Sequence, residues 1–249
     1  MAIVFDAFAE TAASTAPTAI TLAVGSITNG IILVATGSED FGSSGDITSV
    51  SASGLTFTQQ IEHLYNPAGT TQAVCLWSAP SGSTSGNVDI TVSYGSGVDS
   101  GTLFACSFSG VDQTTPMDTA ATTNTITSGT SFSCDITTAT DNAMLVDIVD
   151  HNDGSAVMTK HADQTEIAQL NQSTSQVAGM SYKAAGTAGA KTMSWTADAS
   201  ASRFVYGVVA LRPVAASSSV KTINGLAVAS VKTVNGLAIA SVKTVNGLA

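Results

Sequence analysis

Apolar and polar side chains alternate in short runs along residues 1–213. In NVDITVSYG, Val88, Ile90 and Val92 fall on one face of an extended chain and Asp89 falls on the other. A period of two residues predicts β-strands with one buried face, and no long stretch shows the helical period of 3.6. Runs of the same kind are GTLFACSFSG, SFSCDIT, NAMLVDIVD, AVCLWSA, GIILVATG and RFVYGVVALR. The chain is therefore expected to be all-β.

The turns between these runs favour a compact sandwich. The runs recur about every 10–18 residues and are separated by glycine- and proline-rich clusters such as YNPAGTT and APSGSTSGN. This spacing predicts a β-sandwich or jelly roll of roughly a dozen strands. Ile31–Val34 and Phe204–Leu211 are apolar on both faces and are expected to be central strands. The irregular segment 111–130 is expected to cross from one sheet to the other.

The amino-acid composition favours some classes of protein and argues against others. Charged residues make up only 10% of the chain, and hydroxyl, amide and small residues replace them, as in adhesins, virion proteins and carbohydrate modules. The net charge is −10 with eight basic residues, which argues against nucleic-acid binding. The opening MAIVFDAFAETAAS lacks the basic and apolar regions of a Sec signal, and no run of eighteen apolar residues predicts a membrane span.

The cysteines and tryptophans are expected in the core. Cys75, Cys106 and Cys134 are too few and too scattered for a disulfide framework, so we expect reduced, buried thiols; an inter-strand disulfide is the alternative. Trp77 and Trp195 lie in strand-like runs and are expected to be core residues. The alternative is a platform that stacks on sugars, with further contacts expected from the aromatic residues near loops, Phe41, Tyr65 and Tyr182.

The chain ends in a repeat. After a short connector, 214–218, residues 219–249 hold three copies of an eleven-residue unit, SVKTVNGLAIA with minor changes. Each copy carries an Asn-Gly pair, the strongest signal for a two-residue hairpin turn, and its flanks are rich in β-branched residues. The turn positions are Asn224, Gly225, Asn235, Gly236, Asn246 and Gly247. We expect β structure here.

The repeat is expected to assemble chains. Its apolar positions recur every eleven residues: Val220, Ile223, Leu226, Val231, Val234, Leu237, Val242, Val245 and Leu248. A segment this small buries too little apolar surface to fold alone, so a strict repeat needs a partner. The simplest partner is the same tail from other subunits around a symmetry axis, as in a trimer with its lysines facing water. Docking on the chain's own domain or on another protein, and a flexible linker, are the alternatives.

No constellation for catalysis or for a cofactor stands out. His63, His151 and His161 lie outside any recognised nucleophile or zinc motif, and no G-x-S-x-G elbow occurs. We therefore expect neither an enzyme nor a bound cofactor.

One loop is a weak candidate for a metal site. Asp150, Asn152 and Asp153 precede a glycine in VDIVDHNDGS, and oxygen ligands at such spacing can wrap calcium, although the full motif and its distal Glu are absent. A polar loop that caps a strand explains the same residues. A second acidic loop, with Glu39, Asp40 and Asp46, is expected to be a solvated turn.

Residues 1–213 resemble an all-β domain that recurs in phage and bacterial proteins. The matching phrases are ITSVSASGLTFTQQ, AVCLWSAP, FSGVDQTTPMDTA, TATDNAMLVDIV, ADQTEIAQ and KTMSWTADASASRFVYGVVALRP. The terminal VKTVNGLA units are similar to the ends of predicted phage structural proteins. The resemblance carries no catalytic residues.

Together these resemblances imply a non-enzymatic structural protein of a phage virion, such as a head fibre, a decoration protein or a tail-fibre component. Its expected partners are further copies of itself and other virion proteins, with a host-surface glycan as a further candidate. Assembly would take place in the host cytoplasm and release would follow lysis. The alternatives are a carbohydrate-binding or adhesive module and a cell-surface filament subunit that assembles by strand addition.

Overall fold

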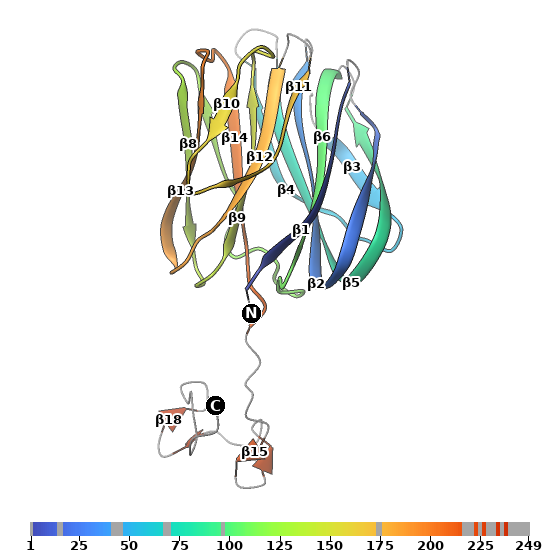
Figure 1. Cartoon of the computed structure of the whole chain (residues 1–249), viewed down its shortest axis with the longest axis vertical. Helices are drawn as coiled ribbons and strands as arrows, with labels where there is room; N and C mark the ends of the chain where they lie inside the picture. The colour runs from blue at the N-terminus through green and yellow to red at the C-terminus, as the bar shows by residue number, and fades with distance from the viewer. Residues whose placement is uncertain are drawn as a thin grey trace. The chain divides into compact units, whose positions relative to one another are not determined.

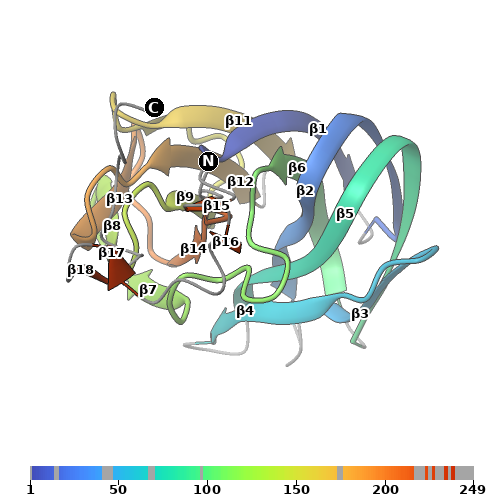
Figure 2. The same ribbon diagram turned by 90° about the horizontal axis from the view of Figure 1, so that it is seen from below.

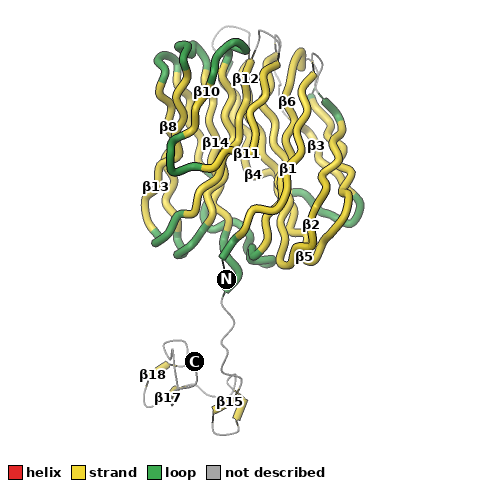
Figure 3. Tube along the Cα trace, viewed as in Figure 1, coloured by secondary structure: helices red, strands yellow, loops and turns green. Residues whose placement is uncertain are grey.

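The structure is a computed structural model of the chain, and it describes residues 2–13, 17–40, 47–66, 71–95, 98–172 and 176–215. It also describes the backbone of four short strands within 222–238. The chain divides into two compact units, Met1–Val214 and Ala215–Ala249, which are considered separately. The described residues form strands and loops and contain no helix, as Figure 3 shows. The expected all-β class is confirmed.

Three antiparallel sheets make up the first unit. The first sheet, in the order β1-β6-β2-β5-β3 with β4 also paired to β5, contains β1 (Val4–Ala13), β2 (Ala19–Asp40), β3 (Ile47–Ala52), β4 (Thr58–Tyr65), β5 (Thr71–Tyr94) and β6 (Val98–Ser109). The second, in the order β11-β12-β9-β14-β7, contains β7 (Thr122–Ile126), β9 (Met144–His151), β11 (Thr165–Gln172), β12 (Gln176–Ala184) and β14 (Phe204–Leu211). The third, in the order β10-β13-β8, contains β8 (Ser131–Thr138), β10 (Met158–Lys160) and β13 (Gly189–Ala197).

The second sheet lies between the other two, with the third sheet on the left and the first on the right in Figure 1. One hydrophobic core, which includes Leu33 and Phe104, fills the space between the first and second sheets. Another, which includes Phe132 and Trp195, fills the space between the second and third. Because the second sheet has a core on each face, every residue of β9 and β14 is buried. The expectation that Phe204–Leu211 forms a central strand is confirmed.

The first sheet curves back on itself (Figure 2). Its long strands β2 and β5 pair along most of their length, and register shifts between Val24 and Ile31 interrupt the ladder. Such irregularities bend a strand and increase its twist. The bend helps to enclose a third core on the outer face of this sheet, which includes Leu22, Val34 and Val92. Ile31–Val34 is therefore buried on both faces, as its sequence predicted.

The segment 111–130 crosses from the first sheet to the second, as expected, but it is not wholly irregular. It contains β7, which pairs with β14 at the edge of the second sheet. The crossing begins at Gly110, whose φ is 79°, and a Cβ there would lie 2.5 Å from the backbone oxygen of Ala2. Asp112 then accepts hydrogen bonds from the backbone of Thr114 and Thr115, which closes a local turn.

Alternation along β8 agrees with the sequence in detail. Phe132, Cys134 and Ile136 are buried, and the residues between them are exposed. Cys134, Cys106 and Cys75 are all buried free thiols, so the expectation of reduced core cysteines is confirmed.

In the second unit the described backbone forms two small antiparallel pairs. β15 (Thr222–Ile223) pairs with β16 (Leu226–Ala227), and β17 (Thr233–Val234) pairs with β18 (Leu237–Ala238). Ile223 faces Leu226 in the first pair, and Val234 faces Leu237 in the second, which is the same position one repeat later.

A substitution at Gly207 tests how tightly the middle sheet packs against β4. A Cβ at this position of β14 would lie 2.8 and 2.9 Å from two side-chain carbons of Ile61 on β4. We expect Gly207→Ala to lower the free energy of unfolding by about 1–3 kcal/mol, because the core would be overpacked. Urea denaturation of Gly207→Ala, Ile61→Ala and the double variant measures the coupling. Additive losses in the double variant would contradict this packing.

Candidate functional site

The structure describes only part of the repeat tail. Among the positions expected to mediate assembly, four lie in the paired strands. Ile223 is paired with Leu226, and Val234 is paired with Leu237, each pair with two residues between its members. The remaining apolar positions lie outside the described residues: Val220, Val231, Val242, Val245 and Leu248. The turn positions lie outside them as well: Asn224, Gly225, Asn235, Gly236, Asn246 and Gly247.

The three residues of the weak calcium candidate have separate surroundings. The Asp150 side chain is fully buried between the first and second sheets. Asn152 uses its Oδ1 to accept hydrogen bonds from the backbone of Ser202 and Arg203. Asp153 lies in the exposed turn, where its Oδ1 accepts bonds from the backbone and hydroxyl of Ser155. These oxygens therefore cap the turn, as the alternative interpretation predicted, and do not form one ligand set with Asp150.

The acidic loop that was expected to be a solvated turn is divided in a similar way. Glu39 is buried at 5% exposure and forms an ion pair with Arg203, with 2.8 Å between Oε1 and Nη2. The expectation of a solvated turn is therefore wrong for Glu39. Asp46 lies outside the described residues, and only the backbone of Asp40 is described.

Asp147 is a buried hydrogen-bond hub between the second and third sheets. Its Oδ2 accepts bonds from Trp195 Nε1 at 2.9 Å and from the Tyr206 hydroxyl at 2.8 Å. Its Oδ1 accepts bonds from the backbone N–H and the hydroxyl of Ser181. Burial raises the pKa of Asp147 to about 6, although these hydrogen bonds lower it in part. Trp195 is thus a core residue, as expected, and its indole N–H helps to hold the carboxyl group.

A second buried polar group lies at one end of the space between the first and second sheets, where β2 ends and β14 begins. We call it the inter-sheet polar layer, and its members are Gly37, Glu39, Gln72, Thr102, Asp150, Gln176 and Arg203. These residues come from five strands and from the residue just before β14. Along the same strands, the apolar residues of the first core face this space. The interior therefore changes from apolar to polar at this end.

Hydrogen bonds link the two sheets within this layer. Gln72 Nε2 donates to Asp150 Oδ2 at 2.6 Å. Gln176 Nε2 donates to the carbonyl oxygen of Gly37 at 3.2 Å. A Cβ on Gly37 would lie 2.9 Å from Asp150 Cγ, so the carboxyl group lies against this backbone. Burial raises the pKa of Asp150 well above its usual range, and the Glu39 carboxylate raises it further. The bond from Gln72, the backbone of His151 and the charge of Arg203 lower this pKa in part.

The three histidines have separate hydrogen-bond partners. His63 bonds to Thr125 Oγ1 at 2.7 Å, and the exposed His161 bonds to Asp163 at 2.6 Å. His151 is buried, and its Nδ1 accepts a bond from the backbone of Asp153. Burial lowers the pKa of His151, so its neutral form is favoured. Among the described residues, no group of three or more His, Cys, Asp and Glu side chains is placed to hold a metal ion.

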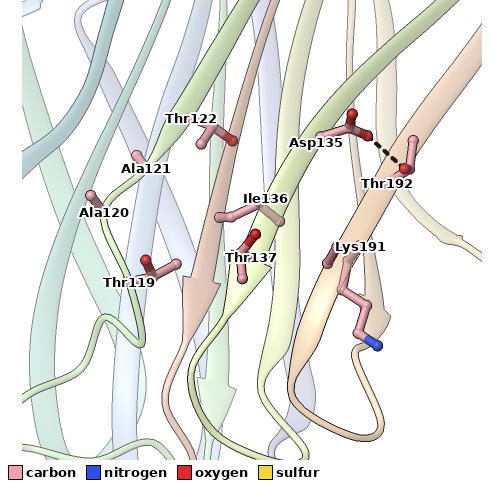
Figure 4. Close-up of a pocket in the computed structure, with 10 residues that line it drawn as sticks. Thr119, Ala120, Ala121, Thr122, Asp135, Ile136, Thr137, Lys191 and Thr192 are labelled. Atoms are coloured by element: carbon pink, nitrogen blue, oxygen red, sulfur yellow. Dashed lines mark hydrogen bonds between the residues drawn. The ribbon is translucent and has the colours of Figure 1, made fainter.

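A shallow groove of about 640 Å³ is lined by residues 119–122 and by parts of β8 and β13 (Figure 4). Threonine and alanine side chains dominate its lining, and Asp135 accepts a hydrogen bond from Thr192 at its edge. A neighbouring groove shares Lys191 and Thr192 and adds the ion pairs of Asp163 with His161 and Lys183. The lining of both grooves contains hydroxyl and charged groups, and no Trp, Tyr or Phe contributes to the described lining of either.

The aromatic residues considered for sugar stacking lie elsewhere. Trp195 is buried in the second core, and Trp77 is half-buried against the third. Tyr182 stacks on Phe5 with 5.1 Å between ring centroids, and Tyr65 packs against the first core. Phe41 lies outside the described residues.

No family model, curated protein or solved structure matches the chain. Among the described residues there is no helix with the length and apolar character to cross a membrane.

The raised pKa of Asp147 predicts how the free energy of unfolding depends on pH. Its pKa of about 6 in the folded state lies above the ordinary value of 3.8. Its contribution to stability is therefore fully present below about pH 4 and is lost as the pH rises through 6. The difference corresponds to about 3 kcal/mol. Urea denaturation from pH 4 to pH 7 should show stability falling, and Asp147→Asn should make the profile flatter.

Asp118→Asn provides the control for this pH profile. Burial raises the pKa of Asp118, but hydrogen bonds from Thr140 and Ala139 outweigh burial and leave the pKa lowered. The contribution of Asp118 therefore has the opposite sign and is lost as the pH falls through its folded-state pKa. A profile that Asp147→Asn leaves unchanged would contradict the hub assignment.

Proposed function

We propose that this chain is a non-enzymatic structural protein of a phage virion, which assembles into a trimer through its C-terminal repeats. In this proposal the sandwich is the displayed body of a head fibre, decoration protein or tail-fibre component. The resemblance of both regions to phage proteins supports the virion setting. The repeat itself supports the assembly role.

One observation carries the assembly role: equivalent positions pair in successive repeats. Ile223 pairs with Leu226, and eleven residues later Val234 pairs with Leu237. Each pair is a minimal two-stranded ribbon, and such ribbons are at best marginally stable in water. Neighbouring copies of the tail would supply the missing apolar contacts, because identical repeats present identical rows.

Charge supports a second candidate for the partner of the tail. Lys221, Lys232 and Lys243 are the charged side chains of residues 215–249, and all eighteen Asp and Glu residues lie in residues 1–214. A basic tail would be attracted to the acidic sandwich of its own or a neighbouring chain. This interaction would weaken with salt, whereas an apolar seam between tails would persist.

A glycan-binding module has weaker support. The groove beside β13 offers hydroxyl groups and Asp135, which suit a polyhydroxylated ligand. It lacks the aromatic platform that sugar sites commonly use, since Trp195 and Trp77 pack against cores.

Removal of the tail tests the assembly role directly. We expect residues 1–214 to remain folded, because they form a compact unit with buried cores of their own. Sedimentation velocity should show a monomer for this truncated chain and a trimer for the full chain. An oligomer of unchanged size after truncation would exclude the tail as the assembly element.

Charge substitution tests the apolar seam. We expect Asp at Leu226, Leu237 and Leu248 to weaken association by at least about a hundredfold in Kd, because each buried leucine contributes roughly 1.5–3 kcal/mol. The matched control places Asp at Ser219, Ser230 and Ser241, which adds the same charge to each repeat at a polar position. Sedimentation equilibrium at low and high salt distinguishes association between tails from docking of the tail on the sandwich. Equal effects of both triple variants, or dissociation by salt alone, would favour docking on the sandwich.

A further inference from the structure

The inter-sheet polar layer contains more acceptors than its donors can satisfy. Three oxygens have no hydrogen-bond partner among the described residues: Gln72 Oε1, Asp150 Oδ1 and Gln176 Oε1. All three residues are 0% exposed. In this layer the unpartnered donor atom is Arg203 Nε. Buried polar atoms almost always have partners, so three unfilled acceptors at one place indicate a missing electropositive group.

The contacts bring these oxygens into one neighbourhood. Gln72 bonds to the other oxygen of the Asp150 carboxyl group, so their free oxygens lie on adjoining groups. Gln176 bonds to the Gly37 carbonyl, and the Asp150 carboxyl carbon lies against Gly37. The three side chains come from β5, β9 and β12, which belong to two facing sheets. They therefore lie on the facing sides of the two sheets, next to the backbone of Gly37.

The charges of the layer also favour a cation. Its ionisable groups are Glu39, Asp150 and Arg203. Arg203 forms its ion pair with Glu39 at 2.8 Å and acts on Asp150 as a more distant charge, and no basic side chain of the described residues forms an ion pair with Asp150. His151, the next residue, points to the other face of the sheet, where it packs against Phe132 and Phe204. An uncompensated buried carboxylate is costly unless a cation or a proton neutralises it.

We propose that the inter-sheet polar layer binds a hard metal cation through Asp150 Oδ1, Gln72 Oε1 and Gln176 Oε1. A carboxylate and two amide oxygens are the ligand types that calcium and other hard cations prefer. A water molecule would donate to two of these oxygens and bring no charge, whereas a cation can contact all three oxygens and neutralise the carboxylate. The cation would join the first and second sheets at the end where the apolar core stops. This site is independent of the tail, so its failure would leave the proposed assembly untouched.

Thermal unfolding of the full chain tests the site. The metal-free protein, prepared with a chelator and held in choline chloride, is compared with samples in calcium, magnesium, sodium or potassium chloride at equal ionic strength. We expect one of these cations to raise Tm by roughly 5–10 °C at about a hundred times its Kd. Chelator reverses the shift for a divalent ion but not for a monovalent ion, which separates the two sources. No shift with any of the four cations would overturn the proposal.

Two matched variants locate the ion. Asp150→Asn keeps the shape of the side chain and removes its charge, so it should abolish the cation-dependent shift. Asp153→Asn makes the same change in the exposed turn three residues later and should retain the full shift. The reverse result would place the ion in the turn and refute the interior site.

A direct measurement of ion binding tests the site even if the Asp150→Asn variant does not fold. Equilibrium dialysis of the full chain should find one bound ion per molecule. Gln72→Met and Gln176→Met, which each remove one oxygen ligand, should each weaken binding by at least about tenfold. Unchanged binding in both variants would refute the ligand set.

Discussion

The structure depends on a sheet whose two central strands are shielded from water on both faces. Every residue of β9 and β14 is buried, because the first sheet covers one side of the second sheet and the third covers the other. Apolar side chains suit this position, but a polar side chain must find its partners inside the protein. The arrangement joins two cores into one unit. A polar side chain on the central strands of the middle sheet therefore affects stability through the partners that it finds inside the protein.

Two carboxyl groups on β9 show the effect of position within that sheet. Asp147 and Asp150 are three residues apart, so strand alternation sends them to opposite faces. Asp147 meets Trp195, Tyr206 and Ser181, whose donors satisfy both of its oxygens. Asp150 accepts a hydrogen bond from Gln72 with one oxygen, and its other oxygen has no hydrogen-bond partner in the part of the chain that the structure describes. The first group therefore cross-links the second and third sheets, and the second is suited to hold a ligand.

The two units of the chain differ in the source of their order. The sandwich encloses its own cores, whereas the described strands of the repeats form pairs only two residues long. The proposed assembly would supply from neighbouring chains the apolar contacts that such short pairs lack. The cation proposed between the sheets would stabilise the body without contributing to assembly.

Much of the sandwich could be predicted from the sequence because strand alternation is a local property. The period of two identified β8 and its buried Cys134, and runs that are apolar on both faces identified the central part of β2 and all of β14. The sequence placed Asp150 beside Asn152 and Asp153 as a weak calcium candidate and favoured a polar loop that caps the strand, and in the structure the three residues have separate surroundings. The actual neighbours of Asp150 are Glu39, Gln72 and Gln176, which lie far from it along the chain. Strand alternation predicts which face of a sheet a residue occupies, but it does not predict which residue lies opposite. That is decided by the packing and pairing of strands that are distant in the sequence.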